Sequence, residues 1–229
     1  MGAEMGIEHI NAKGGIKSLG GAKLKLVVID CGDTTEKAKN AAQRMVAQET
    51  DLVAATGAYL SSFTLAVTEV TERAQLPVLT LSYSDLITDR GFKFIFQTAA
   101  TASRQSELGL PELMKLAETA SGKRPKTVAM IMDNTATSVA TAKALKEKLL
   151  AQEGLQLVVD EVWTPPLSDA TPLIQKVRSA RPDLLLFMPN AVSDAKLGLE
   201  KINEFGLGQG RSRPSLSASP SPSRTCCKA

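Results

Sequence analysis

The sequence is poor in the residues that most catalytic and metal sites use. It contains one histidine, His9, and three cysteines, Cys31, Cys226 and Cys227, with no CxxC spacing among them. A zinc site needs a cluster of such ligands, so we predict no metal site. The motifs GxSxG and GxGxxG and the phosphate-binding loop are all missing from the sequence. We therefore predict no cofactor and no enzymatic activity.

The sequence also lacks the marks of nucleic-acid-binding and membrane-spanning proteins. Its formal net charge is +3, and acidic and basic residues are interspersed without a basic stripe that carries aromatic side chains. We therefore predict no nucleic-acid partner. No apolar run approaches the roughly 20 residues that a membrane-spanning helix needs. The first residues show no signal peptide, so this sequence by itself predicts a chain that stays in the cytoplasm.

What the sequence does contain is a regular alternation of apolar strands and amphipathic helices. Continuous apolar strands that alternate with helices indicate parallel sheets with helices on both faces. Strands are expected at residues 23–30, 52–56, 78–81, 92–97, 127–132, 156–163 and 183–188. Helices are expected at residues 3–13, 33–49, 61–75, 101–120, 138–152, 171–180 and 194–205. Asp33 and Glu36 are expected to form a capping box, and Ser61 or Ser62 to cap the next helix.

The alternating pattern occurs twice, and the two halves meet near residues 97–101. We expect an α/β protein of two Rossmann-like, doubly wound parallel-sheet lobes. Residues 1–100 form an N-terminal lobe that lacks its first strand, and residues 101–208 form a partial second lobe. Residues 209–229 are rich in serine, proline and arginine, and we expect this tail to be disordered. Two origins of this tail are open. We favour a frameshifted or damaged gene end, and the alternative is a flexible linker.

Several stretches resemble the leucine/isoleucine/valine-binding family of periplasmic proteins. They are GIEHINAKGGI, TTEKAKNAAQRMV, TGAYLSS and LSYSDLITDRGFKFIFQTA. The INAKGGI turn and the pattern SxSDxxTxRGFKxxFxT are the most specific together, and the resemblance covers residues 2–208. It implies the periplasmic binding protein type I fold, with the ligand held in a cleft between two lobes, and a periplasmic location.

The resemblance further implies a solute-binding protein that captures an amino acid, branched-chain or related, for an ABC importer. Its partners would be a small-molecule ligand, either an amino acid or a small carboxylate or amide, and the membrane permease of the importer. Three alternatives stay open: a ligand-sensing regulatory protein on the same fold, a non-functional fragment, and an α/β enzyme. An enzyme would need a nucleophile and base pair or a cofactor motif.

We select candidate ligand-binding residues in the first half from the loops after two successive strands. Ligands of open α/β sheets bind beyond the carboxyl ends of strands. Ser61 and Ser62 offer hydroxyl groups at a helix N-terminus, where free N–H groups favour an anion. Ser82, Tyr83 and Ser84 follow the next strand, and the resemblance assigns small polar residues there to the carboxylate and ammonium of the ligand. The alternatives are a plain helix cap and a polar surface loop.

Candidate residues in the second half are Thr137 and Asn190, in the loops after the strands at 127–132 and 183–188. The resemblance implies that both loops face the cleft. Many relatives carry a tyrosine in each loop, and this sequence has Thr137 and Asn190 at the corresponding positions. Whether the ligand is a branched-chain amino acid is therefore open, and a polar or aromatic amino acid is the alternative ligand.

Overall fold

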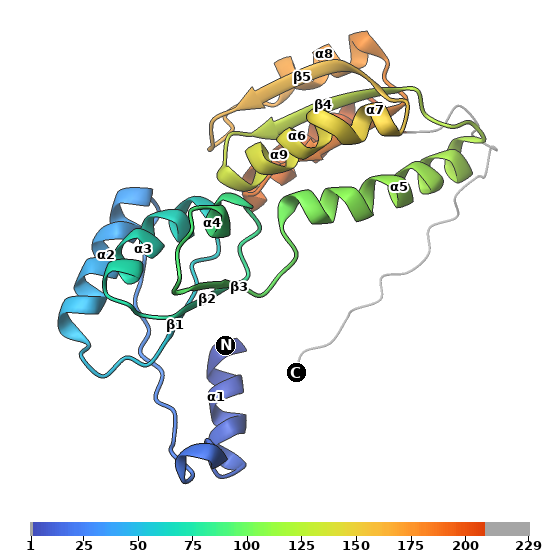
Figure 1. Ribbon diagram of the computed structural model, residues 1–229. Helices are drawn as coiled ribbons and strands as arrows, with labels where there is room; N and C mark the ends of the chain where they lie inside the picture. The colour runs from blue at the N-terminus through green and yellow to red at the C-terminus, as the bar shows by residue number, and fades with distance from the viewer. Residues whose placement is uncertain (1, 209–229) are drawn as a thin grey trace, which may run out of the picture. The chain divides into compact units, whose positions relative to one another are not determined.

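The computed structural model describes residues 2–208 (Figure 1). The chain divides into two compact units, Met1–Ala102 and Ser103–Ala229. The tail at 209–229, for which we expect disorder, lies outside the described residues. Within residues 2–208, no helix is both long enough and apolar enough to cross a bilayer.

The first unit contains a three-stranded parallel sheet with strand order β1-β2-β3. Its strands bury Val78 and Ile95 on one face, whereas Leu79 and Phe96, which alternate with them, are 44% and 53% exposed. Only one face of this sheet is therefore well covered, where the sequence pattern predicts two. The elements are α1 (Gly2–Ala12), η1 (Lys17–Leu19), α2 (Thr35–Gln48), β1 (Ala55–Thr56), α3 (Ser61–Arg73), β2 (Val78–Thr80), α4 (Leu86–Asp89) and β3 (Ile95–Gln97).

The prediction of a strand at residues 23–30 is wrong. This segment pairs with no strand among the described residues, and Figure 1 draws it as a loop that leads into α2. Its alternation of lysine with leucine and valine is typical of a strand, yet a strand also needs a neighbour to complete its hydrogen-bond ladder. No such neighbour lies beside it among the described residues, and Val28 of this segment is 76% exposed.

The starts of α2 and α3 also differ from the predicted caps. Thr34 is the N-cap of α2, and its Oγ1 accepts the N–H of Lys37 at 3.2 Å. Asp33 instead forms an exposed ion pair with Lys37, at 2.7 Å between Oδ1 and Nζ. The capping box of Asp33 and Glu36 is therefore wrong. Leu60 is the N-cap of α3, so neither serine caps that helix.

The second unit contains a parallel sheet of order β5-β4-β6, in which β4 has a partner on each side. Side chains of β4 alternate between two cores: Met130 packs in a cluster with Met114, and Ile131 packs in another with Ile174. Helices therefore cover both faces, as predicted. The elements are α5 (Ala102–Ser121), β4 (Thr127–Asp133), α6 (Ala136–Ala144), η2 (Leu145–Leu149), α7 (Leu150–Gln152), β5 (Gln156–Trp163), α8 (Thr171–Ala180), β6 (Leu184–Met188) and α9 (Val192–Glu204).

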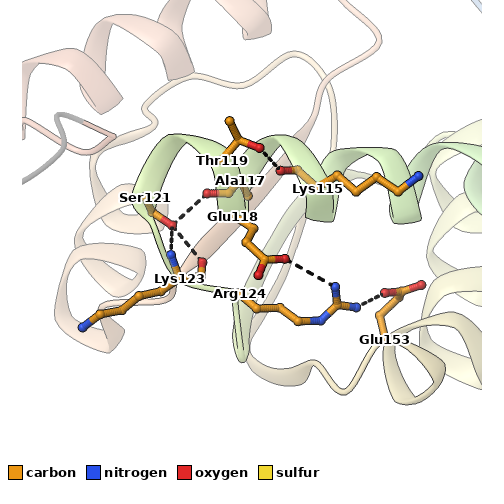
Figure 2. Close-up of polar contacts among 8 residues, drawn as sticks. All are labelled: Lys115, Ala117, Glu118, Thr119, Ser121, Lys123, Arg124 and Glu153. Atoms are coloured by element: carbon orange, nitrogen blue, oxygen red, sulfur yellow. Dashed lines mark hydrogen bonds and ion pairs between the residues drawn. The ribbon is translucent and has the colours of Figure 1, made fainter.

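Polar contacts at the carboxyl end of α5 connect this helix to the rest of the second unit (Figure 2). The Oγ of Ser121 donates to the carbonyl oxygen of Ala117 at 2.7 Å. Arg124 forms ion pairs with Glu118 at the end of α5 and with Glu153, which follows α7. Arg124 thus connects the turn that leads into β4 to the carboxyl ends of α5 and α7.

Helix α9 packs so closely on β6 that its position 198 has no room for a side chain. A Cβ added to Gly198 would lie 2.1 Å from Cζ of Phe187. The ring of Phe187 in turn lies beside the indole of Trp163, with 5.8 Å between the ring centroids. The ring therefore has little freedom to move away from an added methyl group.

We expect Gly198→Ala to lower the free energy of unfolding of the second unit by about 1–3 kcal/mol, as overpacked cores do. Urea denaturation of the full chain measures the change. Gly109→Ala in α5 is the matched control, because no heavy atom lies within 4 Å of the added methyl group. That control should be stabilising by up to about 1 kcal/mol, since alanine has the higher helix propensity. Equal changes in both variants would contradict the close packing of α9.

Candidate ligand-binding site

The carboxyl ends of β1 and β2 bring two serine-containing loops together in the first unit. Parallel neighbours end at the same edge of a sheet, so the loop that enters α3 meets the loop after β2. The Oγ of Ser61 accepts the N–H groups of Tyr83 and Ser84, each at 3.1 Å. Ser61 is only 2% exposed. It therefore joins the two loops that the sequence indicates as a site.

A second set of hydrogen bonds fixes the loop after β2. The Oγ of Ser82 lies 2.7 Å from Oγ1 of Thr64 and 2.8 Å from the carbonyl oxygen of Ala58. The Nε2 of Gln97 donates to the carbonyl oxygens of Ser82 and Ser84, at 2.7 and 3.2 Å. Sequence reasoning missed Thr64 and Gln97. Gln97 ends β3, so the strand-end rule that selected the serines could also have found it.

The five candidate residues of the first unit differ in how far solvent reaches them. Ser61, Ser82 and Ser84 are buried, Ser62 is half-buried, and Tyr83 is 40% exposed. The Oγ of Ser84 is buried without a hydrogen-bond partner among the described residues. Ser61 and Ser82 thus hold the two loops together from within, whereas Tyr83 presents its side chain to solvent. Their roles as ligand contacts stay predictions.

In the second unit, Asn190 binds the carboxylate of Asp133. Asp133 ends β4 and is fully buried. Its Oδ2 accepts the backbone N–H of Asn190 at 2.7 Å and the Nδ2 of Asn190 at 3.0 Å. The same Nδ2 lies 2.8 Å from Oγ1 of Thr135 and 2.9 Å from Oγ of Ser138. Asn190 is therefore turned into the unit, where it ties the loop after β6 to the loop after β4.

Thr137, the other candidate of the second unit, lies half-buried in the first turn of α6. The structure thus places it next to the loop that Asp133 and Asn190 hold. No group of three or more histidine, cysteine, aspartate or glutamate residues within the described part of the chain could hold a metal ion. The chemistry that both loop pairs offer is hydrogen bonding from hydroxyl and main-chain groups.

Comparison with known proteins gives the family. A family model described as periplasmic binding protein matches residues 1–220. The chain belongs to the periplasmic binding protein family. The predicted family is thereby confirmed.

Relatives of this periplasmic binding protein carry related names. The Leu/Ile/Val-binding protein homolog 7 of Brucella melitensis is 29% identical over 208 residues, which are 90% of this chain and 50% of the relative. The Leu/Ile/Val-binding protein homolog 8 of Brucella abortus is 27% identical over 210 residues, with the same coverage of 90% and 50%. The chain thus spans about half the length of the curated relatives it matches.

Solved structures confirm the predicted type I fold. A structure of Rp1789 from Rhodopseudomonas palustris is 26% identical with a TM-score of 0.70, and the match covers 82% of this chain and 49% of that one. A branched-chain amino acid transporter substrate-binding protein, LivJ from Streptococcus pneumoniae in complex with isoleucine, has a TM-score of 0.71 at 22% identity. That match covers 90% of this periplasmic binding protein and 55% of LivJ.

The buried carboxylate of Asp133 stays ionised in the folded protein. Burial raises the pKa of Asp133, but hydrogen bonds from Thr135, Ser138 and Asn190 outweigh burial and hold the pKa below its ordinary value. A carboxyl group whose pKa is lowered by folding stabilises the protein above its unfolded pKa. That stabilisation is lost as the pH falls through the folded pKa.

We expect Asp133→Asn to lower the free energy of unfolding by about 1–3 kcal/mol at pH 7, because charge-assisted hydrogen bonds are lost. The difference from the parent chain should shrink as the pH falls below the ordinary aspartate value of about 3.9. Urea denaturation at pH 7, 5, 4 and 3 measures both effects. Asp160→Asn, which removes a partly exposed ion pair with Lys146, is the control and should change stability by under about 1 kcal/mol. A difference that does not vary with pH would contradict this assignment.

Proposed function

We propose that this protein binds a free amino acid, branched-chain or related, as the solute-binding component of an ABC importer in the periplasm. It acts without catalysing a reaction, and its protein partner is the membrane permease of that importer. The family match supports a solute-binding role. The names of relatives, Leu/Ile/Val-binding proteins and a transporter substrate-binding protein solved with isoleucine, support an amino acid as the solute.

The observation that carries the proposal is the pair of loops that Ser61 joins at the carboxyl edge of the first sheet. These loops hold Ser62 and Tyr83 next to the N-terminus of α3, where main-chain N–H groups and the helix dipole favour an anion. The α-carboxylate of an amino acid is such an anion. The hydroxyl group of Ser62 adds a donor to it, and the ring of Tyr83 offers an apolar surface to the side chain.

The loops after β4 and β6 contribute to capture of the same solute in this proposal. Thr137 supplies a hydroxyl group from the first turn of α6. Asn190 acts differently, because its amide nitrogen already binds Asp133, Thr135 and Ser138. We infer that Asn190 positions the loop after β6, and that main-chain groups of this loop bind the solute.

Thermal unfolding of the full chain against a panel of amino acids tests the proposal. A ligand that binds the native state at 100 times its Kd adds about 2.7 kcal/mol to the free energy of unfolding and raises the Tm. We expect a rise with leucine, isoleucine or valine, or with a polar or aromatic L-amino acid. The D-enantiomer of the same amino acid is the control and should leave the Tm unchanged. A cooperative transition that no amino acid moves at millimolar concentration would refute the proposal.

Substitution of the two neighbouring serines separates binding from loop structure. We expect Ser62→Ala to weaken binding of the identified amino acid by about tenfold, or 1.4 kcal/mol. Ser61→Ala should lower the Tm of the free protein, because the N–H groups of Tyr83 and Ser84 lose their acceptor. Isothermal titration and thermal unfolding measure the two quantities. Unchanged affinity in Ser62→Ala would remove this residue from the site.

A further inference from the structure

Asp194 is a buried acidic residue that the candidate site does not include. It lies in the first turn of α9 and is fully buried. Its Oδ2 accepts the indole N–H of Trp163 at 2.9 Å, and its Oδ1 accepts the hydroxyl group of Ser193 at 3.0 Å. No lysine or arginine pairs with it among the described residues. An apolar residue would be buried there at a lower cost in free energy. The contribution of Asp194 therefore lies in the contact that it makes.

The hydrogen bond from Trp163 to Asp194 spans the carboxyl edge of the second sheet. Trp163 ends β5, whereas Asp194 belongs to the helix that follows β6, and β4 lies between these two strands. Two further contacts hold Trp163 in place. Its carbonyl oxygen accepts the N–H of Asn134 at 2.9 Å, and its indole ring lies beside the ring of Phe187. The indole is therefore a fixed donor, and Asp194 takes its position from it.

Two contacts hold the loop after β6 and the start of α9. Asn190 binds Asp133 at the end of β4, and Asp194 binds Trp163 at the end of β5. Solvent reaches the chain between these two contacts, where Val192 is 86% exposed. The loop is therefore accessible to a solute, while its position is fixed from both sides.

We propose that Asp194 and Trp163 are positioning residues of the solute site, and that Trp163 senses the bound solute through Asp194. The proposal rests on the proposed function, in which main-chain groups of the loop after β6 bind the solute. A solute that binds this loop shifts the first turn of α9, and the carboxyl group of Asp194 moves with it. The electric field of a charge changes steeply over such short distances. Because indole emission depends on that field, binding changes the emission of Trp163.

Fluorescence titration tests the sensing role, because Trp163 is the one tryptophan of the sequence. The full chain is excited where tyrosine does not absorb, and leucine, or whichever amino acid of the panel raises the Tm most, is added. We expect an emission change that saturates according to the Kd from isothermal titration. Asp194→Asn keeps an acceptor for the indole but removes the charge, and should reduce this change about threefold or more. Asp160→Asn, at an exposed position of β5, is the control and should leave the change as in the parent chain.

Isothermal titration tests the positioning role. We expect Trp163→Phe, which keeps an aromatic ring but loses the N–H donor, to weaken binding of the same amino acid about tenfold. Ile174→Val is the control for lost stability, because it removes one methyl group from a fully buried residue of α8. That control should leave the affinity within about twofold of the parent value, although it lowers the Tm.

Three results would overturn the proposal. The first is an emission that stays unchanged at saturating amino acid, and the second is a Trp163→Phe chain that binds as tightly as the parent. The third is equal weakening in Ile174→Val, which would trace the effect to a general loss of stability.

Hydrogen exchange separates this proposal from the proposed function. If no amino acid binds the parent chain, the proposed function fails, and the exchange of the N–H groups at 190–193 then decides the positioning role alone. We expect these groups to exchange about tenfold faster in Trp163→Phe than in the parent chain, since the start of α9 loses one of its two contacts. Equal exchange in the two chains would overturn the positioning role as well.

Discussion

Backbone hydrogen bonding across parallel strands is the requirement on which both units depend. In the second unit, β4 meets this requirement on both sides, and its side chains then supply two cores through Met130 and Ile131. In the first unit, β1 has one partner strand in the described part of the chain, and the segment predicted as a strand at 23–30 has none. The first core is correspondingly small: Val78, Ile87 and Ile95 are its buried members.

Local sequence pattern predicted the elements best in the second unit, where β4 has a partner strand on each side. The strand predicted at 156–163 and the helix at 171–180 have the same bounds in the structure. The segment at 23–30 has an equally clear strand pattern and forms no strand. Pairing depends on what lies beside a segment, and no property of residues 23–30 reports that. The same limit explains the cap of α2, where Thr34 and Asp33 are both suitable and geometry favours Thr34.

For the candidate site, the strand-end rule selected loops that contact each other in the structure, but it did not predict which hydrogen bonds each residue makes. Ser61 and Ser62 are adjacent serines in the sequence, yet Ser61 is buried and accepts the N–H groups of Tyr83 and Ser84, whereas Ser62 is half-buried. Asn190 was selected as a ligand residue, and its amide group meets Asp133 across 57 positions of the chain. Contacts between such distant residues follow from the fold, and a single sequence does not reveal them.

The aromatic residues divide between the two units in a way that affects how the protein can be observed. Trp163, the one tryptophan of the sequence, is 7% exposed in the second unit and donates its indole N–H to Asp194 at 2.9 Å. The two tyrosines, Tyr59 and Tyr83, both lie in the first unit and are exposed. Tryptophan emission therefore reports on the second unit alone. Circular dichroism follows the helices of both halves, so a comparison of the two signals in one unlabelled sample can show whether the halves unfold together.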